Sequence, residues 1–172
     1  MNIVKRWLSR LLNRAVVIEV DYDKPLYIPN GAIGVAEHTP VGVGRMPLEP
    51  SGFELRELPR GMTYDRYIAA HGDDLLCDAA VLDGIVAYIT TDGLDVASIA
   101  RRSADLFGDF RGQIFFLGTT FASRDGVAHV PFLNVGTYMP ALRYACPLHD
   151  PMNSDFDVRV CHLAPIRPMV GP

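Results

Sequence analysis

Apolar residues near the N-terminus recur with the spacing of one helix face. Between residues 3 and 13 they stand at i, i+1, i+4, i+5, i+8 and i+9, as Ile3, Val4, Trp7, Leu8, Leu11 and Leu12. This stripe predicts an N-terminal amphipathic helix in residues 1–14, followed by a single domain in residues 15–172. Its apolar side, with Trp7, Leu8, Leu11 and Leu12, has three open interpretations: it packs on the protein's own core, docks on a neighbouring subunit, or contacts a membrane surface.

The pattern then changes from helical to extended. The β-branched run "AVVIEVDY" at 15–22 predicts a strand. From 25 to 61 prolines and glycines are frequent, which disfavours long regular elements. Short strands are expected at 26–28, 32–36 and 53–58, and the remainder is expected to be an extended, surface-hugging arm or loop. A loop of that length suggests a functional segment or one that becomes ordered against something else.

The middle of the chain has helical spacing. "TYDRYIAAHG" predicts a short helix that ends at Gly72, and "DDLLCDAAVLDGIVAYI" at 73–89 predicts a second, although 85–90 also fits a strand. A third helix is expected in 92–108, with Asp92 as its N-cap and Gly108 as its end.

The last third of the chain is predicted to be β. "QIFFLGTTF" at 113–121 reads as a buried strand that returns through a turn at 123–126 as 127–133. Strands are also expected at 137–146 and 155–163, paired as a hairpin around the loop 147–154, which would bring Cys146 close to Cys161. The predicted fold class is α+β, a small, mostly antiparallel sheet with two or three helices in the middle of the chain.

The charge distribution limits the partners of the chain. The net charge is −4, yet the first fourteen residues carry +4, so the remainder carries −8. A body so acidic is not expected to bind nucleic acid. No apolar run reaches the ~18 residues that span a bilayer, and Arg10 interrupts the N-terminal stretch, which argues against a signal peptide. Three cysteines fit a reducing compartment, so a cytoplasmic protein or a particle component is expected.

The stretch "HGDDLLCD" at 71–78 gathers polar residues that invite two interpretations. His71 with Asp73 or Asp74 has the residue types of a hydrolytic or metal site. Asp73 and Asp74 also precede the apolar run at Leu75, where an aspartate caps a helix and complements its dipole. The capping interpretation is preferred.

A second group of potential metal ligands lies near the C-terminus, in a C-x2-H-x11-C-H arrangement of Cys146, His149, Cys161 and His162. Zinc sites use such pair spacings. If 158–163 is a strand, however, Cys161 and His162 point to opposite faces, so only one of them joins the other two residues. Zinc, a disulfide between Cys146 and Cys161, and reduced thiols remain open, with reduced thiols preferred. No metal or cofactor is expected.

No catalytic signature is present in order: the chain contains no G-x-S-x-G elbow and no Walker A motif. The separate N-terminal helix, the Pro/Gly-rich segment and an arginine-dominated set of basic residues favour a non-enzymatic subunit of a larger assembly, such as a virion or phage particle. Its expected partners are copies of itself or neighbouring subunits. The alternatives are a small hydrolase that uses His71, Asp73 and Asp74, and an acidic binding or inhibitor protein.

Overall fold

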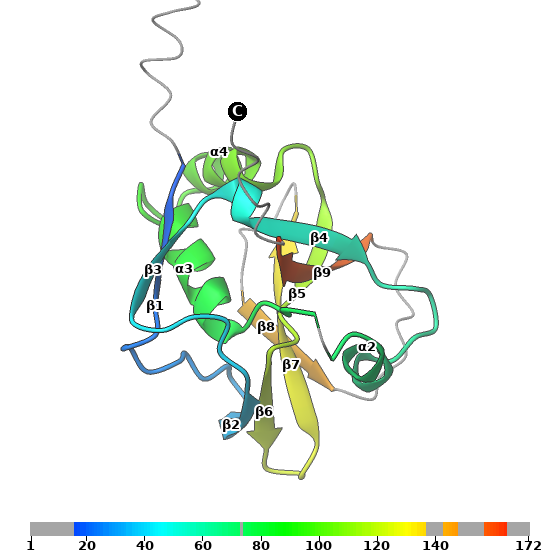
Figure 1. The fold of residues 1–172 in the computed structure, drawn as a ribbon. Coiled ribbons are helices and arrows are strands. Elements are labelled where there is room, and N and C mark those ends of the chain that lie inside the picture. The colour runs from blue at the N-terminus through cyan, green and yellow to red at the C-terminus, as the bar shows by residue number, and fades with distance from the viewer. Residues whose placement is uncertain (1–15, 73, 137–142, 148–156, 165–172) are drawn as a thin grey trace, which may run out of the picture.

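A curved sheet with helices on both faces forms the protein (Figure 1). The computed structural model describes residues 16–72, 74–136, 143–147 and 157–164, with the backbone alone for 143–147. The sheet strands are β2 (Ala32–His38), β4 (Phe53–Glu57), β5 (Gly112–Phe115), β6 (Thr119–Ser123), β7 (Ala128–Val135), β8 (Arg143–Pro147) and β9 (Val158–Leu163), and they follow the order β2-β6-β7-β5-β9-β4, with β8 also paired to β7.

A separate two-stranded ribbon and three helices complete the described chain. The ribbon pairs β1 (Ile18–Asp21) with β3 (Arg45–Leu48), and the short 3-10 helix η1 (Pro50–Gly52) leads from it into β4. The helices are α2 (Tyr64–Ala70), α3 (Ala79–Ile89) and α4 (Val96–Phe107). None of the helices in the described ranges has the length and apolar character needed to cross a bilayer.

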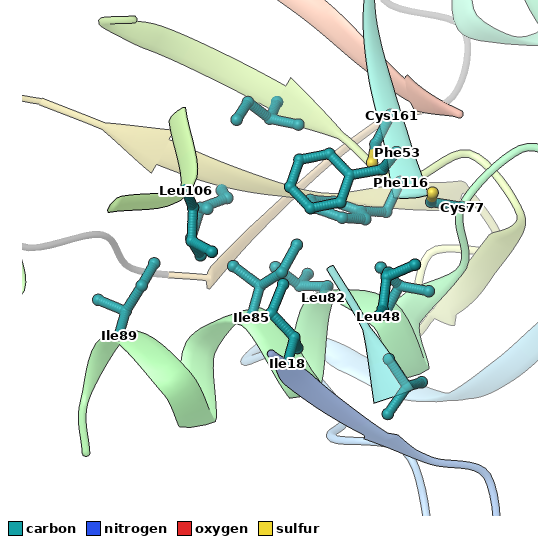
Figure 2. Packing of buried hydrophobic residues seen from close by; sticks show 14 of the residues in the cluster. Ile18, Leu48, Phe53, Cys77, Leu82, Ile85, Ile89, Leu106, Phe116 and Cys161 are labelled. Carbon is teal, nitrogen blue, oxygen red and sulfur yellow. The ribbon is translucent and has the colours of Figure 1, made fainter. Parts of the chain in front are cut away.

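The alternation of side chains along the strands divides the core into two clusters. Ile114, Phe116 and Cys161 face α3, α4 and the ribbon (Figure 2), whereas Phe115 and Val160 face α2. Because neighbouring residues of a strand point to opposite faces, β5 and β9 each contribute buried residues to both clusters. The mixed α+β fold with a mostly antiparallel sheet is therefore confirmed, and only the β5–β9 pair is parallel among the described strands.

A buried aspartate fixes the beginning of α3. Asp78 is fully buried, and its Oδ1 accepts hydrogen bonds from the N–H groups of Ala80 at 2.9 Å and Val81 at 3.0 Å. Its Oδ2 accepts a third from Val41 N–H at 3.0 Å, so the same carboxylate also holds the segment after β2. The prediction that Asp73 or Asp74 caps this helix is wrong for Asp74, because the cap lies four residues later; Asp73 lies outside the described residues.

The helix predictions hold with two corrections. The alternative of a strand at 85–90 is wrong, because residues up to Ile89 belong to α3. The N-cap of α4 is Asp95, whose carboxylate accepts from Ser98 N–H at 3.0 Å, and not Asp92, which instead pairs with Arg101 and Arg102. Gly108 ends α4 with φ of 58°, as predicted.

The segment 25–61 is more regular than predicted. The strands expected at 32–36 and 53–58 are present as β2 and β4, but no strand forms at 26–28, and β3 was not anticipated. The segment is thus part of the sheet and ribbon rather than a long free loop. The single strand expected at 113–121 is split, because the backbone turns at Phe116–Gly118 between β5 and β6, while the β6–β7 hairpin forms as predicted.

The predicted C-terminal hairpin is wrong. β8 pairs with β7, whereas β9 lies between β4 and β5, so the strands that carry Cys146 and Cys161 are not partners. Within β9, Cys161 and His162 are both fully buried. Cys161 is a free thiol next to the equally buried Cys77. The predicted N-terminal helix, the loop 147–154 and His149 lie outside the described residues.

Close packing between α3 and β1 depends on Gly84. A Cβ at this position would stand 2.8 Å from the Glu19 carbonyl oxygen and 3.0 Å from Ile18 Cγ2. Replacing glycine by alanine inside a helix ordinarily stabilises a protein by about 0.5–1 kcal/mol. Here the added methyl group meets backbone that cannot move without separating β1 from the helix.

We therefore expect Gly84→Ala to lower the free energy of unfolding by about 1–3 kcal/mol, as overpacking does. Urea denaturation measures the change. Gly72→Ala is the matched control, because its Cβ would meet only the Ile68 carbonyl oxygen at an ordinary 3.6 Å. A Gly84→Ala variant at least as stable as the parent would contradict the close approach of helix and ribbon.

Candidate functional site

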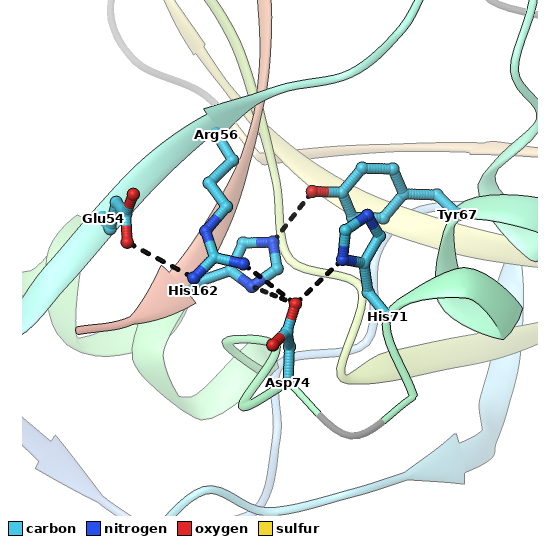
Figure 3. A network of polar contacts seen from close by, with 6 residues as sticks. All are labelled: Glu54, Arg56, Tyr67, His71, Asp74 and His162. Atoms are coloured by element: carbon cyan, nitrogen blue, oxygen red, sulfur yellow. Dashed lines mark hydrogen bonds and ion pairs between the residues drawn. The ribbon is translucent and has the colours of Figure 1, made fainter. Parts of the chain in front are cut away.

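Six polar or aromatic side chains from four parts of the chain meet on the α2 side of the sheet (Figure 3). Arg56 comes from β4, and Tyr67 lies on α2 with His71 directly after it. Asp74 lies in the connection from α2 to α3, and His162 lies on β9. Glu54, on β4, is the sixth member. We call this group the His162 network.

Backbone pairing of the α2–α3 connection brings Asp74 to His162. The Leu163 N–H donates to the Leu75 carbonyl at 2.8 Å, and Cys77 N–H donates to the Cys161 carbonyl at 2.9 Å. The connection therefore runs antiparallel beside the end of β9. On the opposite side of β9, Glu54 stands directly across from His162, and Arg56 follows two residues later on the same face.

The carboxylate of Asp74 is the centre of the network. Its Oδ2 accepts hydrogen bonds from Arg56 Nη1 at 2.9 Å and from His71 Nδ1 at 2.8 Å, and it lies 4.0 Å from His162 Nδ1. The His71 hydrogen bond, followed by the positive charge of Arg56, holds the pKa of this carboxyl below its usual range. Asp74 is thus ionised at neutral pH, and one oxygen serves three cationic or potentially cationic groups.

His162 is the buried member of the network. Its side chain is only 1% exposed, and the Tyr67 hydroxyl stands 2.9 Å from its Nε2. Burial, with the positive charge of Arg56, lowers the pKa of His162 to about 4, so the ring is neutral at pH 7. Because the Asp74 carboxylate faces Nδ1, the tautomer with its proton on Nδ1 is favoured, which leaves Nε2 to accept from Tyr67. Among the described residues, Nδ1 has no hydrogen-bond partner.

Aromatic contacts hold the two histidines in place. The Tyr67 ring stacks on the His71 ring with centroids 4.3 Å apart, and the His71 and His162 rings meet edge to face at 5.9 Å. Tyr67 is 2% exposed, and burial raises the pKa of its hydroxyl. The hydroxyl therefore stays protonated and is available as the donor to His162.

The arrangement can orient a base but does not resemble a metal centre. Asp74 fixes His71 through Nδ1, which leaves Nε2 as the nitrogen available for proton transfer. The approach of Arg56 to Asp74 places a positive charge where a metal ion would have to sit. Among the described residues, no group of three or more His, Cys, Asp and Glu side chains could hold a metal ion.

The sequence identified part of this network. His71 with Asp73 or Asp74 was the alternative to the preferred capping interpretation; the structure brings His71 and Asp74 together, whereas Asp73 lies outside the described residues. His162 was grouped with Cys146, His149 and Cys161; among the described residues it lies with His71 and Asp74. Cys161 points to the other face, as the strand geometry predicts, and packs in the core against Cys77.

Arg56, Tyr67 and Glu54 were not recognised from the sequence. Two local signals were available: Tyr67 precedes His71 by four residues, which places both on one side of a helix, and Glu54 and Arg56 alternate in "FELRE", which places them on one strand face. Neither signal says that the two faces meet.

No model of a known protein family matches the chain, and comparisons with curated proteins and with solved structures give no match either.

The burial of His162 has a consequence for the stability of the protein as pH falls. The pKa of this histidine drops from 6.5, its ordinary value, to about 4 in the folded state. As pH falls, the unfolded chain consequently binds the proton before the folded protein does. The stabilisation that comes from keeping His162 buried and neutral is therefore complete above pH 6.5 and is lost as pH falls toward 4. The shift corresponds to about 3 kcal/mol at most.

We expect the free energy of unfolding, measured by urea denaturation at a series of pH values, to fall by about 2–3 kcal/mol between pH 6.5 and 4. His162→Gln, which cannot titrate, should flatten this dependence. Tyr67→Phe is the control, because it removes the hydroxyl at Nε2 but retains the burial that causes the shift. Equal pH dependence in the parent and in His162→Gln would show that His162 is not the group responsible.

Proposed function

We propose that the protein is a non-enzymatic subunit of a larger protein assembly, of the kind that builds a virion or phage particle, and that it docks through β2 and the segments flanking it. The proposal rests on where the exposed apolar side chains lie. Among the described residues nine large hydrophobic side chains are exposed, and five of them fall between residues 27 and 43: Tyr27, Ile28, Ile33, Val35 and Val43.

This concentration is not what a monomeric surface requires. Exposed apolar side chains scattered singly are normal, whereas a gathering of them marks an interaction surface. Ile33 is 62% exposed and Val43 is 87% exposed. We call the five residues the β2 surface. Burying one side chain of the size of Ile33 against a partner contributes about 1.5–3 kcal/mol to a complex, and part of this gain offsets the entropy lost on association.

The position of β2 in the sheet supports the same conclusion. β2 stands at the end of the strand order and pairs with β6, and no other described strand pairs with its outer side, where a partner could add. Two register shifts, between Ala32 and Gly34 and between Val35 and Glu37, make the strand irregular. Bulges of this kind discourage indiscriminate strand pairing. A partner must therefore fit the side chains of the β2 surface and not merely extend the sheet.

We expect Ile33→Glu to weaken assembly about tenfold or more, because it places a charge in an apolar contact. Light scattering over a concentration series measures the molar mass and hence the dissociation constant. Leu94→Glu is the matched control, since Leu94 is 77% exposed and lies outside the β2 surface. A parent protein that remains monomeric at high concentration and forms no complex with neighbouring subunits would refute the proposal, as would an Ile33→Glu variant that assembles normally.

A small hydrolase is the second candidate, favoured by the 2.8 Å contact between His71 Nδ1 and Asp74 Oδ2. This contact orients a histidine as a general base does. Two features weigh against it. Arg56 competes for the same carboxylate oxygen, and among the described residues no hydroxyl or thiol hydrogen-bonds to His71 as a nucleophile would.

We expect His71→Gln to hydrolyse an activated ester such as p-nitrophenyl acetate at the rate of the parent. Removing a general base costs about a hundredfold or more in rate. A loss of that size in His71→Gln, reproduced by Asp74→Asn, would favour the hydrolase over the assembly subunit. Arg66→Gln, altered on the exposed side of α2, serves as the control for nonspecific effects.

A further inference from the structure

A small pocket with apolar walls and acidic groups lies beside the β2 surface. Its volume is about 220 Å³, and it is formed by the end of β2, the start of β6 and the α2–α3 connection. The apolar side chains that line it include Val41, Ile68, Leu75, Leu76 and Leu117, and its two charged lining residues are Glu37 and Asp74. We call it the Leu75 pocket.

The size of the Leu75 pocket favours one large side chain over a free small molecule. Pockets for drug-sized ligands have volumes of roughly 300–1,000 Å³, and this one is smaller. Leu75 is 58% exposed although it lines the pocket, so an entering side chain would cover apolar surface that now faces solvent. The aromatic side chains bury 150–250 Å² each and are the usual anchors of protein interfaces.

The charge at the pocket favours basic residues on either side of the entering side chain. Glu37 is exposed at its rim, and no lysine, arginine or histidine is among the described lining residues. The charge of Asp74 is paired with Arg56, so Glu37 is the acidic group that faces an incoming ligand. An aromatic residue flanked by basic residues is therefore the complementary ligand. The indole N–H of a tryptophan would also find an acceptor in Asp74, whose Oδ1 accepts no hydrogen bond from any described residue.

The chain itself contains a segment with these properties. Trp7 is its only tryptophan, and Lys5, Arg6 and Arg10 surround it in a stretch without acidic residues. The acidic body and the basic N-terminal stretch are thus complementary in charge. The described chain begins just before β1, which Figure 1 draws beside α3 and toward α4, whereas β2, β6 and α2, which contribute to the pocket lining, are drawn toward the opposite end. This separation favours a neighbouring copy over the same chain as the source of the segment.

We infer that the Leu75 pocket receives Trp7 of a second copy of this chain, so that the basic N-terminal segment of one subunit docks on the acidic face of the next. The inference rests on the proposed function, since it names the partner and the contact of the same assembly. A head-to-tail contact of this kind joins two different surfaces and propagates, which generates rings or filaments rather than only a symmetric pair.

The single tryptophan makes the contact directly measurable. In the parent chain, Trp7 fluorescence should be blue-shifted and protected from acrylamide at concentrations where the protein is assembled. It should return to the emission of an exposed indole on dilution, over the concentration range in which the molar mass falls. A blue shift that persists unchanged in the monomer would overturn the second copy as the occupant, and an exposed Trp7 in the assembled protein would overturn the pocket contact.

Pocket variants locate the contact. Leu75→Asp should raise the protein concentration at which the Trp7 blue shift appears about tenfold or more, because it puts an unpaired charge into the apolar wall. Glu37→Lys should raise the same concentration several-fold, and this effect should be smaller at high salt. The matched controls are Leu94→Asp and Glu49→Lys, both exposed and outside the pocket lining. Pocket variants that bind like their controls would overturn the inference.

A peptide experiment separates this inference from the proposed function. A synthetic peptide of residues 1–14 is titrated into the full chain carrying Trp7→Phe, so the peptide holds the only tryptophan. We expect a saturable blue shift that Leu75→Asp abolishes. If the peptide fails to bind while the parent still assembles, the inference fails and the proposed function stands. If the peptide binds but the parent never assembles, the pocket stands and the proposed function fails.

Discussion

The buried carboxylate of Asp78 is the interaction on which the arrangement of the other elements depends. It accepts hydrogen bonds from N–H groups in the first turn of α3 and from the Val41 N–H. Next to it, the Thr119 hydroxyl oxygen accepts a hydrogen bond from the Ala79 N–H at 2.9 Å. A buried polar side chain is stable only when it is hydrogen-bonded, so these donors and this carboxyl group require one another. The cap thereby ties α3, the segment after β2 and the start of β6 together. Val41, Leu76 and Gly118, which line the Leu75 pocket, lie at this junction.

Gly118 shows how tightly that junction is built. Its N–H donates to the Cys77 carbonyl at 3.0 Å, and a Cβ at this position would stand 2.7 Å from the Leu76 carbonyl oxygen. The α2–α3 connection therefore crosses directly over the break between β5 and β6. This crossing carries Asp74 to His162, and it leaves Leu75 exposed at the edge of the pocket. The His162 network and the Leu75 pocket are consequences of the same chain path.

Local patterns in the sequence predicted the elements better than their partners. Helix periodicity located α2, α3 and α4, and strand alternation correctly placed Cys161 and His162 on opposite faces. The N-caps were misassigned because several aspartates lie close together before α3 and α4, and each satisfies the local rule. For α3, the N-cap is Asp78 because the preceding residues pair with β9 and the Ala79 N–H bonds to Thr119 of β6. Strand pairing depends on contacts distant in sequence, so the expected hairpin and the meeting of Arg56 with Asp74 could not be settled by spacing alone.

The proposed assembly depends on β2 as an edge that becomes covered, and hydrogen exchange tests this most directly. The amides of β2 that do not face β6 should exchange rapidly in dilute, monomeric protein. They should slow markedly, together with those of the flanking residues 27–31 and 39–43, when the concentration is raised until the molar mass increases. Unchanged exchange in β2 upon assembly, with protection appearing instead on the far face at α4, would contradict the account of how this protein associates.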